Sequence, residues 1–337
     1  MAEQPIVTVR ELRKTFDVKH AGGTSKLHAL NGVSFEIMRG ETLGLVGESG
    51  SGKTSAGRVL VGLIPATSGS VTLFGHSITG PDAKRGLAAV RSRLQFVFQD
   101  PYASLNPRMR IGNAIAEPLD VQGTTSRRDR NDRVAELLEL VGLPKISGER
   151  YPHEFSGGQR QRIVIARALA LNPEFVVCDE PVSALDVSMQ AQIVNLLLDL
   201  QDRLGLSYLF IAHDLAVVRA VSTRIAVMYA GAIVETAPKR QLYSDPQHPY
   251  SRALLDAVPR ADPFFVRQPV VAGEVPSLLD PPSGCCFHPR CALAMDRCRT
   301  EVPRLRDSGP DRRVACHLFE DVTKLPLPPP CGHGNRL

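Results

Sequence analysis

The sequence predicts an α/β layered domain followed by a proline-rich extension, and three observations lead to this fold class. Three runs are almost continuously apolar, as strands buried on both faces of a parallel sheet are: Glu41 to Gly47, Glu174 to Glu180 and Leu206 to Asp214. Helical patterns separate them, at Lys53 to Gly62, Gln159 to Leu171 and Gln190 to Leu204. After about Ala237, proline becomes frequent and periodicity fades, so we expect a domain of residues 1–237 and an extension of residues 238–337.

Length and composition limit the classes of protein that this chain can be. Its 337 residues suffice for one large domain with an appendage, and 43% apolar with 22% charged residues is ordinary for a globular protein. The net charge of +5 favours neither a membrane surface nor nucleic acid as a partner. The N-terminus lacks the apolar core of a secretory signal. We therefore expect a cytosolic protein, in which disulfides are rare.

The opening segment differs from the rest of the predicted domain. The stretches "IVTVRELRKTF", "HALNGVSFEIM" and "SGSVTLFGHSI" are short, rich in strand-forming residues and separated by Gly, Asn and Ser. This pattern predicts an antiparallel flank beside the parallel sheet.

The stretch "GESGSGKT" fits the phosphate-loop pattern G-x-x-x-x-G-K-[ST] and lies between a predicted strand and a predicted helix. Backbone N–H groups of such a loop point at phosphate oxygens, which side chains would block. Lys53 would reach the β- and γ-phosphates, and the Thr54 hydroxyl would bind Mg²⁺. The predicted nucleotide-binding residues are Gly47, Glu48, Ser49, Gly50, Ser51, Gly52, Lys53 and Thr54.

Polar residues follow the other predicted strands, where open α/β sheets bind ligands. Asp179 suits the magnesium shell, and Glu180, one residue further on, suits a base that polarises the attacking water. Gln99 in "QFVFQD" would touch both metal and water, and His213 ends the third strand. Taken alone, the acidic pair is as compatible with a solvated loop entry, Gln99 resembles any exposed glutamine, and a histidine at a strand end is more often structural than catalytic.

The stretch "FSGGQRQR" places two glycines directly before a predicted helix. A helix N-terminus without side chains binds anions through its unpaired N–H groups and its dipole. Ser156 adds a capping hydroxyl. The segment Ser156, Gly157, Gly158 and Gln159 is therefore a candidate second phosphate contact, with a plain glycine hinge as the alternative. Since the first loop already wraps one nucleotide, this contact would have to come from another molecule.

In this order, the motifs from Ile6 to about Ala237 resemble the ATP-binding subunits of ABC transporters. "GESGSGKT" is similar to the Walker A loop, Gln99 to the Q-loop, "FSGGQRQR" to the signature, "FVVCDE" to Walker B, "SALD" to the D-loop and His213 to the H-loop. Phe16 falls where that family stacks an aromatic ring on adenine. The resemblance implies a RecA-like P-loop ATPase core with a helical subdomain at about 100–172. It also implies a head-to-tail dimer in which each ATP lies between one subunit's Walker A loop and the other's signature.

A narrower resemblance concerns the dipeptide and oligopeptide importers. "VFQDPYASLNPRMRIGNAIAEPL", "DEPVSALDVSMQAQ" and "HPYSRALLDAVP" look like the subunit conventionally lettered F in that subfamily. It implies an unlike partner ATPase, two transmembrane permease subunits, an extracytoplasmic solute-binding protein reached through the permease, and a location at the cytoplasmic face of the inner membrane. Related importers carry nickel, glutathione or sugars, so these solutes are alternatives.

Four cysteines of the extension, Cys285, Cys291, Cys298 and Cys316, form a candidate metal site. A cytosolic appendage with this many thiols favours metal over disulfides, and their wide spacing suits an iron–sulfur cluster better than zinc. Similar importer subunits imply a [4Fe–4S] cluster at these positions. Zinc and unligated thiols are the alternatives. Cys286 makes the first ligand ambiguous, and Cys331 has no place in the set.

Two other functions are less compatible with the sequence. Soluble ABC ATPases that act on nucleic acid or ribosomes carry a long coiled coil between Q-loop and signature, or two ATPase domains. Here Gln99 and Ser156 are close in sequence and the motifs occur once. An iron–sulfur redox enzyme using ATP would place its cysteines near the nucleotide motifs, whereas these lie far beyond Walker B. We therefore expect a transport ATPase and no nucleic-acid partner.

Overall fold

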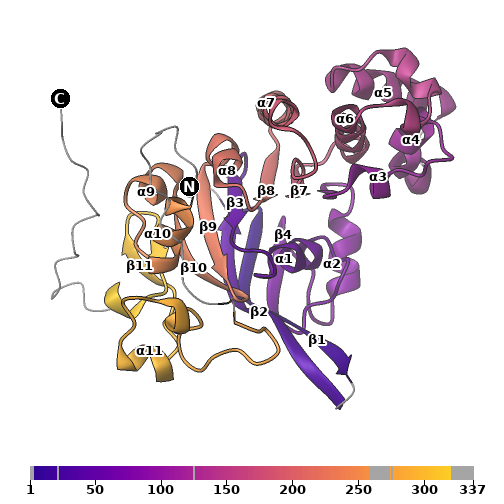
Figure 1. The fold of residues 1–337 in the computed structure, drawn as a ribbon. Helices are drawn as coiled ribbons and strands as arrows, with labels where there is room; N and C mark the ends of the chain where they lie inside the picture. The colour runs from indigo at the N-terminus through magenta and orange to yellow at the C-terminus, as the bar shows by residue number, and fades with distance from the viewer. Residues whose placement is uncertain (1–3, 21–22, 124–125, 258–273, 275, 320–337) are drawn as a thin grey trace, which may run out of the picture.

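The structure, a computed structural model, describes residues 4–20, 23–123, 126–257, 274 and 276–319. The described strands form two sheets (Figure 1). The larger has eight strands in the order β11-β12-β10-β9-β3-β8-β7-β6, and the smaller has four in the order β2-β1-β4-β5. The fold is the predicted mixture of a largely parallel α/β core and an antiparallel flank.

The centre of the larger sheet consists of the three strands that the sequence predicts. These are β3 (Thr42–Val46), β8 (Ser207–Ile211) and β7 (Phe175–Asp179), which are parallel neighbours with every residue buried. On their two sides lie β9 (Arg224–Tyr229) and β6 (Leu94–Val97), also parallel. The continuous apolar runs thus reflect strands covered on both faces.

The smaller sheet contains β1 (Val7–His20), β2 (Gly23–Ile37), β4 (Ser68–Leu73) and β5 (His76–Ser77), and all its pairings are antiparallel. Helix α1 (Lys53–Leu60) lies between the two sheets. Its Ala56, Val59 and Leu60 are buried in a core with apolar residues of both. The antiparallel flank therefore covers one face of the α/β sheet through this helix, and α2 (Ala83–Val90) packs beside β5.

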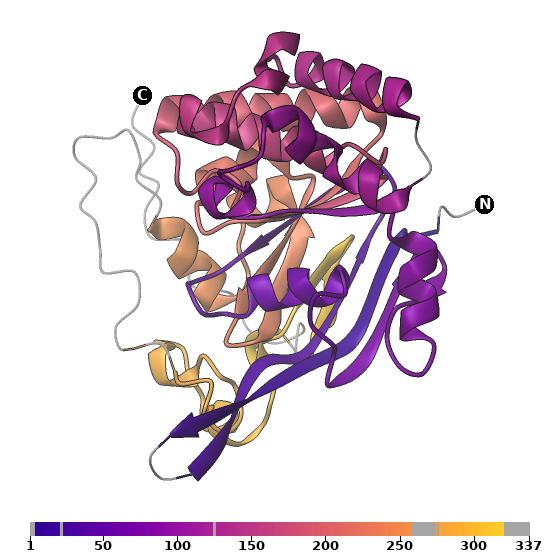
Figure 2. The ribbon, with the colours of Figure 1, turned by 90° about the vertical axis from the view of Figure 1, so that its right-hand side faces the viewer.

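The opposite face of the larger sheet is covered by α7 (Val187–Leu204) and α8 (Leu215–Val221). Beyond them stands a helical group, which Figures 1 and 2 show on the side of the molecule away from the extension. Its members are α3 (Pro101–Ser104), α4 (Ile111–Gln122), α5 (Arg127–Leu140), the 3-10 helices Lys145–Glu149 and Pro152–Glu154, and α6 (Gly157–Ala168). This group overlaps the predicted helical subdomain, whose boundaries stay a prediction.

Helix α6 begins two residues earlier than its sequence pattern predicts. Both glycines lie in its first turn, and Ser156 is the N-cap. Glycine lowers helix propensity, but the serine cap and the apolar face of Ile163 and Val164 against the core outweigh two unfavourable residues at the helix start.

The extension returns to the larger sheet. After β10 (Ala232–Pro238) come α9 (Lys239–Ser244), α10 (Pro249–Asp256), the 3-10 helix His288–Arg290, α11 (Asp296–Thr300), β11 (Arg306–Gly309), β12 (Arg312–Val314) and the 3-10 helix His317–Phe319. Strand β12 pairs antiparallel with β10. The predicted boundary near Ala237 therefore falls inside a strand to which the extension adds two more, and it stays a prediction.

A buried carboxylate fastens the extension to the core. Glu235 on β10 is fully buried, accepts the N–H groups of Gln247 and His248 at 2.9 Å each, and pairs with Arg312 of β12 at 3.0 Å. Because a buried charge must be paired and hydrogen-bonded, this network joins three segments distant in sequence. Cys331 lies outside the described residues. Among the helices that the structure does describe, none has the length and apolar character needed to cross a bilayer.

Candidate functional site

The phosphate loop joins β3 to α1, as predicted. Its backbone is shaped by close neighbours: a Cβ at Gly47 would lie 2.1 Å from the Met228 carbonyl oxygen, and one at Gly52 would lie 2.2 Å from that of Ala29. Gly52 is the N-cap of α1, with φ 100° and no side-chain cap. The first turn of α1 therefore keeps N–H groups that no side-chain cap satisfies, which is the property that an anion site requires.

Lys53 lies at the centre of this loop. Its side chain is buried, and Nζ donates to the carbonyl oxygens of Gly47 and Glu48, 2.9 Å from each. Burial lowers the pKa of Lys53, while the carboxylates of Glu180 and Asp179 act in the opposite direction. The ammonium group thus stands between the loop and the acidic edge of the sheet, where a phosphate would contact both.

Thr54 and Asp179 form the next pair. The Thr54 hydroxyl donates to Asp179 Oδ1 over 2.9 Å, although the residues are 125 positions apart in sequence. Asp179 is buried, which raises its pKa, and the hydrogen bond from Thr54 partly offsets this rise. Two oxygen ligands of the kind that Mg²⁺ prefers are therefore adjacent at the carboxyl edge of the sheet, although β8 separates the strands β3 and β7 that lead to them.

Glu180 gathers the other two predicted residues. Its Oε2 accepts a hydrogen bond from Gln99 Nε2 at 2.9 Å and lies 3.3 Å from His213 Nδ1. Its backbone has φ 48°, an unusual conformation for glutamate, and its N–H donates to the Ile211 carbonyl. The sheet edge thus brings Gln99 and His213 together at one carboxylate oxygen of Glu180. This oxygen can accept a proton from water.

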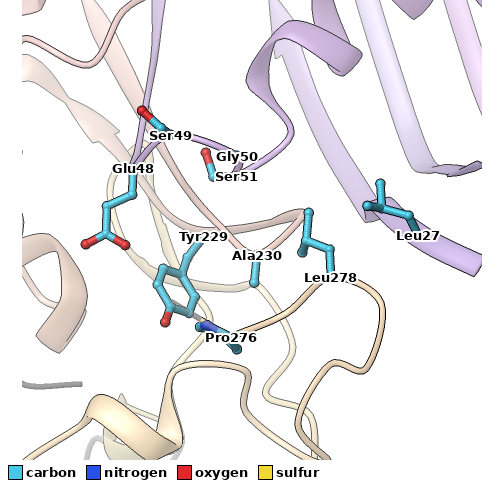
Figure 3. Close-up of a pocket in the computed structure, with 9 residues that line it drawn as sticks. All are labelled: Leu27, Glu48, Ser49, Gly50, Ser51, Tyr229, Ala230, Pro276 and Leu278. Carbon is cyan, nitrogen blue, oxygen red and sulfur yellow. The ribbon is translucent and has the colours of Figure 1, made fainter. Parts of the chain in front are cut away.

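Phe16 lies on the long β1–β2 hairpin, where it pairs with Leu27 in the antiparallel register. Paired residues share one face of a hairpin. Leu27 lines a cavity of about 220 Å³, shown in Figure 3, whose wall includes phosphate-loop residues and two from the extension. The lining residues are Leu27, Glu48, Ser49, Gly50, Ser51, Tyr229, Ala230, Pro276 and Leu278. The cavity thus joins the hairpin face that carries Phe16 to the loop, although Phe16 itself is not in its wall.

The second glycine motif has different surroundings. The Ser156 hydroxyl accepts from the Gln159 N–H at 3.3 Å, and Gln159 Oε1 accepts from the Ser156 N–H at 3.0 Å, which is a capping box. A Cβ at Gly157 would meet only Leu185, at 3.5 Å, and one at Gly158 would meet the terminal methyl of Met189 at 1.8 Å. Neither glycine is constrained by a neighbouring backbone, and the four residues stand in the helical group.

The four predicted cysteines are close enough to influence one another. Burial is the main cause that raises the pKa of Cys285 to about 11 and that of Cys316 to about 12, and charge on Cys298 and Cys291 contributes to both rises. The Cys285 N–H also donates to the Cys298 carbonyl at 2.8 Å. Charge on Cys286 would likewise raise the pKa of Cys285, and it would also raise that of Tyr229. Within the described part of the chain, however, no three His, Cys, Asp or Glu side chains are placed to hold a metal ion.

The sequence did not predict that the extension reaches the phosphate loop. The Glu48 N–H donates to the Tyr250 hydroxyl at 2.9 Å, and the Glu48 carboxylate pairs with Arg290. Tyr250 belongs to the "HPY" stretch, which the sequence marks only as a subfamily feature. No local pattern connects either residue to a loop more than 200 positions away.

Known families match most of the described chain. Residues 30–183 match the family described as ABC transporter, and residues 234–298 match the oligopeptide/dipeptide transporter C-terminal region. A Brucella abortus protein named as a peptide import ATP-binding protein is 65% identical over 94% of this chain and 95% of its own length. A Brucella ovis protein with the same kind of name is 51% identical over 94% and 98%.

Solved structures show the same core. An ATP-binding cassette solved as a dimer in a post-hydrolysis state with ADP and phosphate has TM-score 0.62 and 30% identity, covering 69% of this chain and 99% of that one. A Clostridium perfringens protein that is part of an ABC transporter complex has TM-score 0.61 and 25% identity, covering 72% and 92%. The predicted α/β fold is confirmed by these similarities.

Proposed function

The chain belongs to the ABC transporter family, and we propose that it is the ATP-binding and ATP-hydrolysing subunit that powers import of dipeptides or oligopeptides. The arrangement at the sheet edge carries this proposal, because Lys53, Asp179 and Glu180 meet there around the phosphate loop. The match of residues 234–298 to the oligopeptide/dipeptide transporter C-terminal region supports the class of solute. So do the relatives named for peptide import.

The residues of the loop bind and orient the triphosphate. Backbone N–H groups of residues 47–54 and the Lys53 ammonium hold its oxygens, and Phe16 stacks on the adenine. Thr54, Asp179 and Gln99 are the groups that would hold Mg²⁺, which when bound neutralises charge on the phosphates. The pairing of Thr54 with Asp179 at 2.9 Å fits such a site.

Glu180 accepts the proton of the attacking water. Its Oε2 is the shared partner of Gln99 and His213, so both side chains restrict where the carboxylate points. Since a neutral glutamine donates to it and the histidine ring lies beside it, the carboxylate is oriented for a water in line with the γ-phosphate. Gln99 and His213 serve to orient that water and to report the state of the site.

The second half of each ATP site comes from another ATPase subunit, which we propose to be an unlike one. The N-terminus of α6, with Ser156, Gly157, Gly158 and Gln159, supports this arrangement, since Ser156 and Gln159 are exposed and Gly157 is half-buried, and only Gly158 is buried. The segment would therefore contact the phosphates of ATP held by the partner's loop, and the partner's segment would contact the ATP held here.

The permease subunits have a candidate docking surface. A groove of about 180 Å³ runs between α1, α2 and β6, lined by Val61, Leu63, Leu87, Arg91, Leu94, Gln95, Phe96 and Phe98. Leu63 is 54% exposed, and Tyr102, just beyond Gln99, is 61% exposed. Apolar side chains exposed beside the Gln99 segment suit a helix from a membrane subunit, because binding there would act directly on the catalytic glutamine. The chain would then lie peripherally at the cytoplasmic face of the inner membrane, with the solute-binding protein reached through the permease.

The [4Fe–4S] cluster stays a proposal for Cys285, Cys291, Cys298 and Cys316. The influence of charge on Cys298 and Cys291 on both Cys285 and Cys316 supports it, while Cys286, whose charge also acts on Cys285, keeps the first ligand ambiguous. The described arrangement would have to tighten, because thiols with raised pKa must lose their protons before they bind metal. Iron and acid-labile sulfide in anaerobically purified protein are the expected result, and zinc or neither would contradict it.

Glu180→Gln tests the proposed function. In the assembled transporter we expect ATP binding to persist while the hydrolysis rate falls by roughly 10²- to 10⁴-fold, since the amide cannot accept the proton of water. The matched control is Glu139→Gln, whose side chain is 59% exposed in the helical group. Near-normal hydrolysis by the Glu180 variant would exclude this residue as the base.

A further inference from the structure

Glu48 of the phosphate loop is held by the extension at both its backbone and its side chain. Its N–H donates to Tyr250 Oη at 2.9 Å. Its carboxylate receives two parallel hydrogen bonds from Arg290, Nη1 to Oε2 at 2.8 Å and Nη2 to Oε1 at 3.1 Å. Bidentate pairs of this kind are strong and fix the orientation of both groups.

The arginine is firmly placed. Its side chain is only 6% exposed, and Nη1 also donates to Tyr229 Oη at 3.2 Å. Tyr229 and Tyr250 pack against each other and against Phe287, three positions before Arg290, with ring centroids 4.6 to 5.4 Å apart. Arg290 is therefore held in place by packed aromatic rings, and it fixes the loop from a position 242 residues further along the chain.

The charge of Glu48 makes this contact more than a structural brace. A carboxylate in a loop that binds a triphosphate repels the ligand unless its charge is neutralised or directed away. Figure 3 shows the Glu48 side chain pointing away from Ser49 and Ser51, toward the side of the loop where Tyr229 lies. Arg290 meets both conditions. Its guanidinium neutralises the charge of the Glu48 carboxylate, and the two hydrogen bonds hold that carboxylate on the side of the loop where Tyr229 lies.

We propose that Arg290 is a positioning residue for ATP binding, which acts by neutralising Glu48 and holding it away from the nucleotide, with Tyr250 fixing the Glu48 backbone. The inference rests on the proposed function, because it assumes that the loop binds ATP. It gives the extension a direct part in the nucleotide site. It also predicts the direction of the effect: removal of the Arg290 side chain weakens ATP binding mainly while Glu48 keeps its negative charge.

The test is a double-mutant cycle on the full-length chain, with the dissociation constant of magnesium–ATP measured by calorimetry. Arg290→Met should weaken binding roughly tenfold, the scale of a lost charged hydrogen-bond pair. In a Glu48→Gln background the same substitution should weaken binding by less than about threefold, since no carboxylate is left to repel the phosphates. Arg304→Met, at an exposed arginine of the same extension, is the matched control.

Ionic strength separates electrostatics from packing. The loss of ATP affinity in Arg290→Met should become smaller when KCl rises from about 0.05 M to 0.5 M, because salt screens the charge of the unpaired Glu48 carboxylate. Arg290→Lys keeps the charge but loses the paired geometry, so it should fall between wild type and Arg290→Met. This variant carries the test if Arg290→Met does not fold, as judged by thermal unfolding.

Three results would contradict the inference or the function on which it rests. An equal loss of affinity in both backgrounds, insensitive to salt, would show that Arg290 only anchors the fold and would overturn the inference. Unchanged affinity in Arg290→Met would do the same. Wild-type protein that fails to bind ATP would overturn the proposed function itself, a result distinguishable from either of these because it does not depend on any substitution.

Discussion

Two helices of this chain, α1 and α6, begin at glycine-rich stretches, and the surroundings of the two stretches differ. At the start of α1, Gly47 and Gly52 are pressed against carbonyl oxygens of other segments, and a Cβ at either would lie 2.1 to 2.2 Å from one. At the start of α6, Gly158 meets only the end of a methionine side chain and Gly157 meets a leucine at ordinary contact distance. Backbone atoms cannot yield, whereas side-chain ends can move.

The capping of the two helices differs in the same direction. The N-cap of α1 is Gly52, with no side-chain hydrogen bond, whereas α6 is closed by the capping box of Ser156 and Gln159. The fold of this chain thus requires the glycines at α1 but leaves those at α6 largely unexplained. A residue that its own chain does not require is a candidate for contact with another molecule, which is why the difference favours a site shared with a partner.

Gly52→Ala should have the largest effect. The new Cβ would collide with the Ala29 carbonyl in a backbone conformation, φ 100°, that alanine rarely adopts. We expect a loss of about 3 kcal/mol or more in the free energy of unfolding, measured by urea denaturation, together with loss of ATP binding. Gly50→Ala is the control: its φ is +78° but a Cβ meets open space, so it should cost only about 1 kcal/mol. Equal losses would contradict the role of the backbone contact.

Ser156→Ala should have a smaller effect, about 1 kcal/mol, because the α6 N-terminus loses its cap. Ser156→Asp keeps a capping oxygen and should restore the stability. In the assembled transporter, however, the added carboxylate should lower ATP turnover below that of Ser156→Ala, since it would face the phosphates of the partner's ATP. Normal turnover in Ser156→Asp would argue against any phosphate at this helix start.

Gly157→Ala should change stability least, by less than about 1 kcal/mol, because its neighbour Leu185 lies at ordinary contact distance and alanine favours helices. The comparison between the two helices is sharpest here. If a partner's phosphate approaches this turn, ATP turnover of the assembled transporter should fall although the isolated chain unfolds and binds ATP as the wild type does. Unchanged turnover would show that Gly157 is not needed for contact with a partner's phosphate. The difference between the two helix starts would then not indicate a shared site.

Much of the candidate site could be predicted from the sequence because it depends on strand ends. Thr54 and Asp179, and Glu180 with Gln99 and His213, follow strands whose carboxyl ends share one edge. A strand predicted from its apolar run therefore also predicts where the next polar residue lies. The cysteines lie in or beside short elements, such as α11 around Cys298, so their spacing predicted a group but not its geometry, and the described residues do not form a metal site.

The start of α6 and the course of the extension were harder to predict. Propensity placed the helix start at Gln159, whereas the cap of Ser156 places it at Gly157. Fading periodicity suggested a separate appendage, yet β12 joins the main sheet, and the carboxylate of Glu235 is buried against Arg312. Short elements bury little of their own surface, so their pattern is weak and only distant pairing stabilises them.

The sequence by itself determined the α/β core, the antiparallel flank and the chemical groups of the candidate nucleotide site, because period and motif are local properties of the chain. Only the tertiary structure decided that Arg290 and Tyr250 hold the phosphate loop, and that Gly52 is constrained by a backbone neighbour while Gly157 is not. The physical reason is that these contacts join residues brought together by packing of separate layers, and packing depends on the whole chain.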